Sequence, residues 1–196
     1  PRGRDKIGAP MVLSPIAGFI GAYLVMLGIL WTFRHRNPGR VTRGFRMAQT
    51  VSAAAMAFGH GVQDAAKIMG VVVLALKVGG YQSGDDIPIW VFFMTAAVLA
   101  AGTYAGGWRI MRTLGRKIIE LDPPKGFAAE STAALILYIA AIKFAAPIST
   151  THTITASIMG AGATKRFSSV QWGMAGNIGA GWVMTCPGAG WLPALC

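Results

Sequence analysis

The amino-acid sequence predicts an all-α integral membrane protein, and three observations support this prediction. Hydrophobic residues make up 54% of the 196-residue chain, and the mean hydropathy is +0.52. Charged residues make up only 13%, against about 25% in an average soluble domain. The charges also cluster between long apolar runs, as expected when lipid surrounds those runs. We therefore expect a single transmembrane domain, residues 1–196, that crosses the cytoplasmic membrane several times.

Three apolar runs match the length that a transmembrane helix needs, since a hydrocarbon core about 30 Å thick takes about 20 helical residues to cross. These runs are residues 10–33, 88–108 and 127–146. Residues 1–9 precede the first run, and we expect them to be a linker. A last candidate span covers residues 170–195, although two prolines interrupt it. The two cysteines, Cys186 and Cys196, are too few for a disulfide framework and are expected to be inert.

The loops between these runs predict an orientation. Residues 34–46 and 109–125 are rich in Arg and Lys, whereas the loop at residues 80–87 is acidic. Basic loops stay on the cytoplasmic side, so the acidic loop should face outward. The net charge of +11 is thereby explained by topology, and no nucleic-acid partner is expected. This orientation requires residues 47–78 to make one net crossing.

Arginines recur at three-residue spacing within the first basic segment, at Arg40, Arg43 and Arg46. This spacing predicts a short helix at the membrane surface with one basic face. Such a face either stays solvated as part of an inner loop or contacts anionic lipid headgroups. We favour the solvated loop over a specific lipid site.

Polar sequence interrupts two of the apolar stretches. Residues 47–78 are interrupted at residues 58–67, where two glycines and four polar or charged side chains gather. The second stretch, residues 147–166, opens with a proline and a run of serine, threonine and histidine. Its apolar part reaches only to Ala163, which is short for a crossing. Because charge at the membrane centre costs on the order of 2.5–3.5 kcal/mol, we predict a broken helix at 47–78 and a re-entrant segment at 147–166.

Such interruptions suit the binding of an anion. A helix that begins inside the membrane offers free backbone N–H groups and the positive end of its dipole. Ser149, Thr150 and Thr151 would add hydroxyl donors at such a helix start, and midplane sites of transporters are built in this way. In the first interruption, Lys67 lies three residues after Asp64 and therefore on the same helical face. No nucleophile elbow or zinc motif is present, so we expect no enzymatic activity.

Two motifs, about 90 residues apart, carry a resemblance that covers nearly all of the chain. Residues 60–70, HGVQDAAKIMG, and residues 147–152, PISTTH, are similar to the paired motifs of the inorganic phosphate transporter (PiT) family. The resemblance is to the C-terminal half of the bacterial low-affinity type. It implies a symporter with two inverted repeats, of which this chain would supply one and a missing N-terminal repeat the other. It also implies a homodimer, and a coupling ion that is H⁺ or Na⁺, with no further cofactor and no bound metal.

The resemblance assigns roles to two sets of residues. The expected phosphate contacts are Ser149, Thr150 and Thr151. The expected contacts for the coupling ion or proton are His60, Gln63, Asp64, Lys67 and His152. Gln63 stands where the family commonly has asparagine, and Lys67 stands where many sodium-coupled members have a second asparagine. Because a fixed ammonium at Lys67 could replace a bound cation, we predict proton coupling rather than sodium coupling.

Plainer interpretations remain open beside these. The histidines could be ordinary buried groups, Asp64 and Lys67 a structural ion pair, and the hydroxyl run a helix-packing surface. Glu130 and Lys143 are interpreted as interfacial or structural. The cargo could be another oxyanion or a metal–phosphate complex, and the chain could be a membrane subunit or fragment that does not itself transport.

Overall fold

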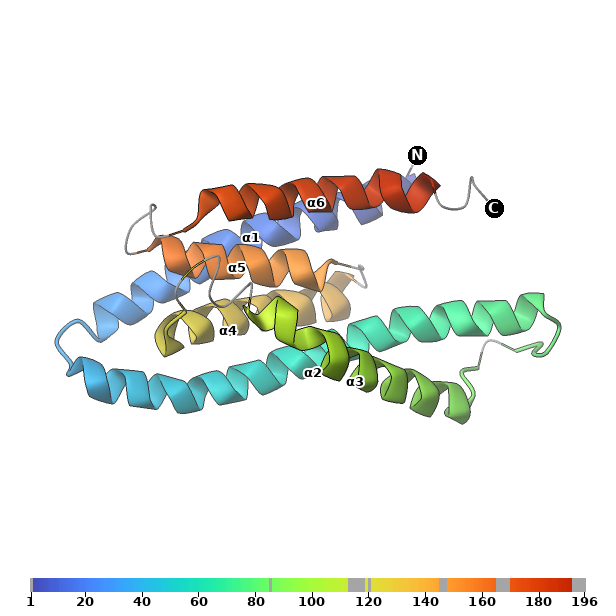
Figure 1. Ribbon diagram of the computed structural model, residues 1–196, viewed down its shortest axis with the longest axis horizontal. Helices are drawn as coiled ribbons and strands as arrows, with labels where there is room; N and C mark the ends of the chain where they lie inside the picture. The colour runs from blue at the N-terminus through green and yellow to red at the C-terminus, as the bar shows by residue number, and fades with distance from the viewer. Residues whose placement is uncertain are drawn as a thin grey trace.

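The computed structural model describes residues 2–84, 86–112, 119, 121–144, 148–164 and 170–191, and every regular element within them is a helix (Figure 1). The helices are α1 (Arg2–Thr32), α2 (Pro38–Val78), α3 (Ile89–Arg112), α4 (Pro123–Ile139), the π-helical segment η2 (Ala140–Phe144), α5 (Thr150–Ala163) and α6 (Trp172–Trp191). The structure therefore confirms the all-α prediction.

Three of these helices are long and apolar enough to cross a membrane. Their candidate spans are Leu13–Thr32, Ile89–Trp108 and Pro123–Ile142, close to the three predicted runs. Helix α6 lies within the predicted last span, while the side chain of Cys186 and the whole of Cys196 lie outside what the structure describes. The chain is a helical membrane protein.

Helices α1, α4 and α5 pack together and form the core. Small side chains fill it, because Ala22, Ala128, Ala129 and Ala161 are fully buried. Helix α1 approaches α5 closely at Gly18, where an added Cβ would lie 2.8 Å from the Ser157 Oγ. Small residues allow such close approach of helices in membranes. Larger side chains such as Met26 and Ile158 complete the core between these close contacts.

Helix α1 begins at Arg2, so residues 2–9 are helical and the expected linker is wrong. The prediction placed this segment outside the helix because it precedes the first apolar run. A charged segment beyond the membrane span can continue a helix in water, however, because its side chains remain solvated. The sequence thus located the apolar span correctly but not the helix that contains it.

Helix α2 is continuous over 41 residues, so the predicted break at 47–78 is also wrong. Gly59 and Gly61 each weaken a helix by only about 1 kcal/mol relative to alanine, which tertiary packing can offset. Gly59 contributes to that packing, because an added Cβ would lie 3.3 Å from the Tyr138 Cζ on α4. The Tyr138 hydroxyl also donates a hydrogen bond to the Ala55 carbonyl at 3.0 Å. The glycine therefore permits a close crossing of α2 and α4 rather than a break.

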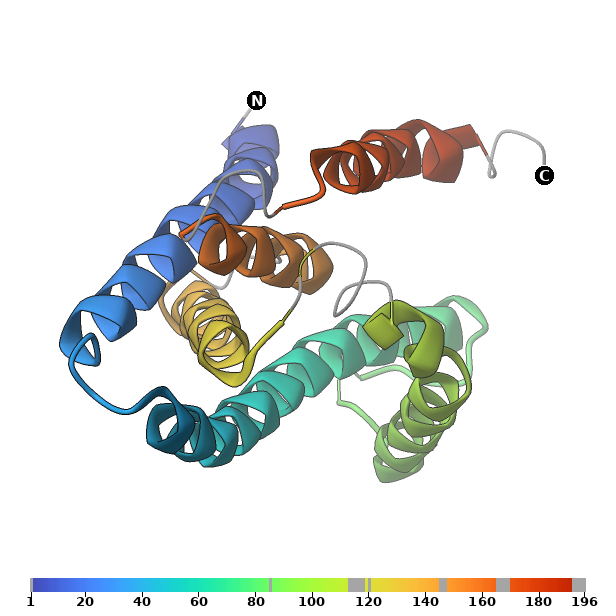
Figure 2. The same ribbon diagram turned by 60° about the vertical axis from the view of Figure 1, so that its left-hand side comes forward.

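Helices α4 and α5 pack against each other and lie side by side in both views (Figures 1 and 2). Helix α5 has 14 residues, about 21 Å at 1.5 Å per residue, which is shorter than a hydrocarbon core of about 30 Å. It ends at Ala163, where the sequence predicted the apolar stretch to end. A short helix that returns beside α4 is the geometry expected for a re-entrant segment, and its depth in the membrane stays a prediction.

The helix ends fall into two groups along the long axis of the molecule. The loop between α1 and α2 and the start of α4 lie at the left in Figure 1, and the loop between α2 and α3 lies at the right. Helix α2 thus joins the first basic segment, residues 34–46, to the acidic loop at the other end of the molecule (Figure 1). Helix α2 is not among the three candidate spans, so its single net crossing of the membrane stays a prediction.

Candidate functional site

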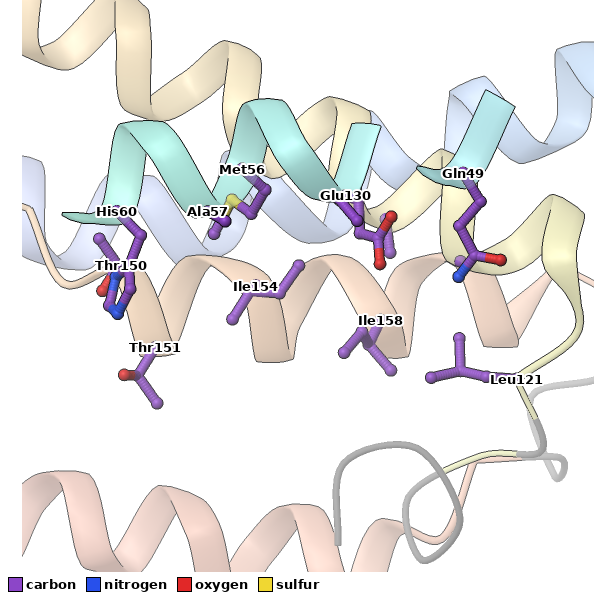
Figure 3. A pocket seen from close by; sticks show the side chains of 13 residues that line it. Gln49, Met56, Ala57, His60, Leu121, Glu130, Thr150, Thr151, Ile154 and Ile158 are labelled. Carbon is purple, nitrogen blue, oxygen red and sulfur yellow. The ribbon is translucent and has the colours of Figure 1, made fainter. Parts of the chain in front are cut away.

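A cavity of about 400 Å³ lies between α2, α4 and α5 (Figure 3). Each helix contributes a face with helical spacing. Helix α5 presents Thr150, Ile154 and Ile158, which are four residues apart, together with Thr151. The residues from α2 are Gln49, Ala53, Met56, Ala57 and His60. The cavity is therefore apolar along its walls, with a few polar groups at defined places, as ligand pockets usually are.

The start of α5 supplies hydroxyl groups and backbone donors at one end of this cavity. Ser149 is the N-cap, and its Oγ accepts a bond from the His152 N–H at 3.4 Å. The first intrahelical bond runs from the Thr153 N–H to the Ser149 carbonyl at 3.1 Å, so the N–H groups of Thr150 and Thr151 precede the helical ladder. The positive end of the helix dipole adds to these donors. This is a favourable environment for an anion.

The side chains of the first motif form a chain of polar contacts along α2. The His60 Nε2 lies 3.4 Å from one Asp64 carboxylate oxygen, and the Lys67 Nζ lies 3.3 Å from the other. Their spacings of four and three residues place all three on one helical face. Of the three, His60 lines the cavity, and it lies at the same end as Thr150 in Figure 3. Asp64 and Lys67 continue away from the cavity.

Gln63 has a different position and links α2 to α4. Its side-chain amide donates to the Leu137 carbonyl at 3.2 Å, just before η2 begins. π-Helical turns inside α-helices often mark functional sites. Gln63 does not line the cavity, so the structure gives it a role in helix packing beside the site.

His152 points toward α6 rather than into the cavity. Its ring stacks on the Trp182 indole, with 4.1 Å between centroids and 30° between planes. This contact holds the beginning of α5 against the middle of α6. His152 is thus a contact between the start of α5 and α6, and it does not line the cavity.

Glu130 is a cavity residue that the sequence analysis assigned to the membrane interface. One of its carboxylate oxygens accepts a bond from the Ser52 Oγ at 2.8 Å, and the Gln49 side chain also hydrogen-bonds it. Figure 3 places Glu130 beside Gln49, toward the opposite end of the cavity from His60. The signal was present in the sequence, because an ionisable residue inside a transmembrane span marks a functional site by default.

The structure thus brings together part of each predicted motif. His60, Thr150 and Thr151 line one cavity. The other candidates, Ser149, Gln63, Asp64, Lys67 and His152, contact these residues or their helices without lining it, and Pro147 lies outside the described residues. No group of three His, Cys, Asp or Glu side chains within the described ranges could hold a metal ion. The site consists of hydroxyls, backbone donors, a histidine and a carboxylate.

A helix that begins beside a polar cavity between membrane helices is the arrangement found in secondary transporters. The comparison with known proteins is specific. The Phosphate transporter family matches residues 3–192, and the chain belongs to that family. The family consists of transporters rather than enzymes, in agreement with the prediction of no enzymatic activity.

Individual relatives agree with this assignment. A protein described as a probable low-affinity inorganic phosphate transporter from Rhizobium meliloti (strain 1021) is 44% identical over 196 residues, which cover 100% of this chain and 58% of that protein. A protein of the same description from Mycobacterium tuberculosis (strain ATCC 25618 / H37Rv) is 41% identical, with 97% of this chain and 46% of that protein covered. The chain spans about half the length of the curated relatives it matches.

The fold also matches a solved structure, described as "The sodium-dependent phosphate transporter". The TM-score is 0.65 at 23% sequence identity, and the match covers 95% of this chain and 54% of that chain. At this identity the likeness shows the fold alone. It supports the arrangement of the helices around the cavity.

Proposed function

We propose that this chain forms one repeat of a proton-coupled symporter of inorganic phosphate in the cytoplasmic membrane. The observation that carries the proposal is the start of α5, whose two threonines face the same cavity as His60 and Glu130. The first turn of a helix, whose backbone N–H groups have no partner within the helix, binds phosphate readily. The printed descriptions of the relatives name the same substrate.

In this proposal, phosphate lies against Thr150 and Thr151. Their hydroxyls donate hydrogen bonds to its oxygens, and the dipole of α5 offsets its charge. Ser149 contributes mainly by capping, because its oxygen already accepts the His152 N–H, although its hydroxyl hydrogen can still be donated to phosphate. His152 maintains the orientation of this helix start through its contact with Trp182.

The charges around the cavity support proton coupling. A carboxylate at Glu130 and a phosphate anion in one low-dielectric cavity repel each other, so each favours binding of a proton when the other is present. Protonated Glu130 and phosphate would therefore move together. The Lys67 ammonium lies 3.3 Å from the Asp64 carboxylate, in the position where a bound sodium ion could otherwise neutralise this group. His60 is the group that connects Asp64 to the cavity.

The curated relatives are about twice as long as this chain, which supports a transporter with two repeats. We propose that a second, inverted repeat completes the site, that the transporter works by alternating access, and that it forms a homodimer. Two alternatives are kept for the experiment to decide. The cargo could be another oxyanion or a metal–phosphate complex, or the chain could lack transport activity of its own.

The test measures radiolabelled phosphate uptake by the full-length transporter that contains this chain, reconstituted in liposomes. Replacing Thr150 and Thr151 by valine keeps their shape and removes both hydroxyls. Two hydrogen bonds to a charged ligand contribute about 1.5–3 kcal/mol each, so uptake should fall by about 100-fold or more. Thr164→Val is the matched control, since this threonine ends the same helix and bonds only the Ala161 carbonyl.

Three further arms separate the alternatives. Uptake should persist in sodium-free buffer and increase with an inward proton gradient, and strict sodium dependence would contradict proton coupling. Arsenate should compete, whereas competition by sulfate at equal concentration would favour a general oxyanion carrier. Dependence on added divalent metal would indicate a metal–phosphate cargo. Unchanged uptake in the valine variant would refute the placement of phosphate at α5.

A further inference from the structure

Two further cavities lie where α1 ends and α2 begins, away from the proposed phosphate site. The larger has a volume of about 420 Å³ and the smaller about 240 Å³. They adjoin each other, because Phe33, Arg36 and Val41 line both. The first basic segment of the sequence thus surrounds a hollow instead of only forming a solvated loop.

The walls of these cavities are strongly basic. Arg36 and Arg40 line the larger cavity, and Arg34 lines the smaller. None of these arginines forms an ion pair with any carboxylate among the described residues. Among the described residues that line the two cavities, the one acidic group is Asp122 in the smaller cavity, and its carboxylate lies 3.3 Å from the Lys125 ammonium. The larger cavity therefore presents uncompensated positive charge.

Apart from Asn37 and Thr42, the other residues of α1, α2 and the turn between them that line the cavities are apolar or aromatic. Phe33 and Phe45 line the larger cavity and contact each other edge to face, with 5.5 Å between centroids. Phe45 also contacts Phe127 of α4, with 5.4 Å between centroids. The smaller cavity continues along α1 at Met26, Ile29 and Leu30, within a candidate membrane span. One continuous hollow therefore combines a basic mouth with an apolar wall that enters the membrane.

We propose that this hollow binds an anionic phospholipid, with the headgroup phosphate between Arg36 and Arg40 and an acyl chain along the apolar wall. Free phosphate would use the arginines and leave the apolar wall exposed to water, so the combined lining favours a lipid. The basic loop is also expected on the cytoplasmic side, where anionic lipids create a negative surface potential and basic pockets between helices bind their headgroups. The contact would stabilise the junction of α1, α2 and α4.

The experiment measures binding of phosphatidylglycerol to the full-length transporter in detergent, by native mass spectrometry in phosphate-free buffer. The test variant is Arg36→Gln/Arg40→Gln, and the matched control is Arg43→Gln/Arg46→Gln, which removes the same charge from two residues of α2 that line neither cavity. With about 1 kcal/mol per basic residue, the test variant should bind at least about 10-fold more weakly, and the control should change by about 2-fold or less.

Each further measurement of lipid binding has a result that supports or contradicts the proposal. Restored binding in Arg36→Lys/Arg40→Lys, and weak binding of phosphatidylcholine by the wild type, would support it. Equal loss in both glutamine variants would overturn it in favour of diffuse attraction to a basic surface. Displacement of the lipid by millimolar inorganic phosphate would overturn it in favour of a free-anion site. Because no transport is measured, failure here leaves the proposed function of the α5 site unaffected.

Discussion

The two polar motifs of this chain both lie among membrane helices, yet their backbones are in opposite states. The first motif lies in the interior of a continuous helix α2, where its backbone groups belong to the helical ladder. The second lies at the start of α5, where the helical ladder has not yet begun. Only the second can therefore offer backbone donors to a ligand. The first contributes side chains alone, through His60 at the cavity and Asp64 and Lys67 behind it.

The two motifs therefore offer different chemical groups to a ligand. The start of α5 has backbone and hydroxyl donors that suit an anion, whereas the face of α2 carries an imidazole, a carboxylate and an ammonium group. Glycine in the first motif serves the crossing with α4, and the proline-led second motif serves to begin a helix. Polar sequence within apolar stretches thus indicates a site, but it does not indicate whether the backbone there is a continuous helix or the start of one.

The largest expected effect tests the continuity of α2. Gly61→Pro should destabilise the protein by about 3 kcal/mol, because proline in a helix interior removes one hydrogen bond and clashes with the preceding turn. Gly61 has nothing within 4 Å of an added Cβ, so the effect would come from the backbone. Thermal unfolding in detergent, compared with Gly61→Ala, measures it.

The alanine control should be as stable as the wild type or more stable by up to about 1 kcal/mol, since alanine favours the helix. If Gly61→Pro were as stable as Gly61→Ala, the helix would be broken at this position, as the sequence alone suggested. The contrast between the two motifs would then disappear.

The next prediction concerns the carboxylate that shares the cavity with α5. Phosphate binding to the wild type should strengthen as the pH falls, because protonation of Glu130 removes repulsion between two anions. Glu130→Gln resembles the protonated form and should bind phosphate about as well at low pH. At high pH it should bind about 10-fold more tightly than the wild type.

Isothermal titration across a pH series measures this difference, and the ionisation of phosphate itself affects both proteins equally. Ser131→Ala is a suitable control on the same helix, because its hydroxyl bonds only backbone carbonyls of its own helix. A pH dependence that is identical in the wild type and in Glu130→Gln would exclude this carboxylate from coupling.

These experiments also show what the sequence could and could not predict. Hydropathy located three spans to within a few residues, since lipid imposes length and composition directly. The Ser149–His152 run was correctly interpreted as the start of a helix, because proline and hydroxyl residues favour that position. The break at Gly59 and Gly61 was wrong, because the packing of Tyr138 against Gly59 depends on α4, which is more than 60 residues away in the sequence. The cavity position of Glu130 was missed for the same reason.

The smallest expected effect on stability is at Lys67, and it distinguishes a structural ion pair from a substitute cation. Lys67 and Asp64 side chains are 49% and 33% exposed, so their pair should contribute less than about 1 kcal/mol, and Lys67→Asn should unfold at nearly the wild-type temperature. If Lys67 replaces a coupling ion, however, the variant leaves Asp64 without its positive partner and adds an amide ligand. Uptake should then become stimulated by sodium, while Lys67→Arg should remain independent of it. Sodium-independent uptake by Lys67→Asn at the wild-type rate would mean that the ion pair has only a structural role on α2. His60 would then be the one residue of the first motif that is left as a candidate for coupling.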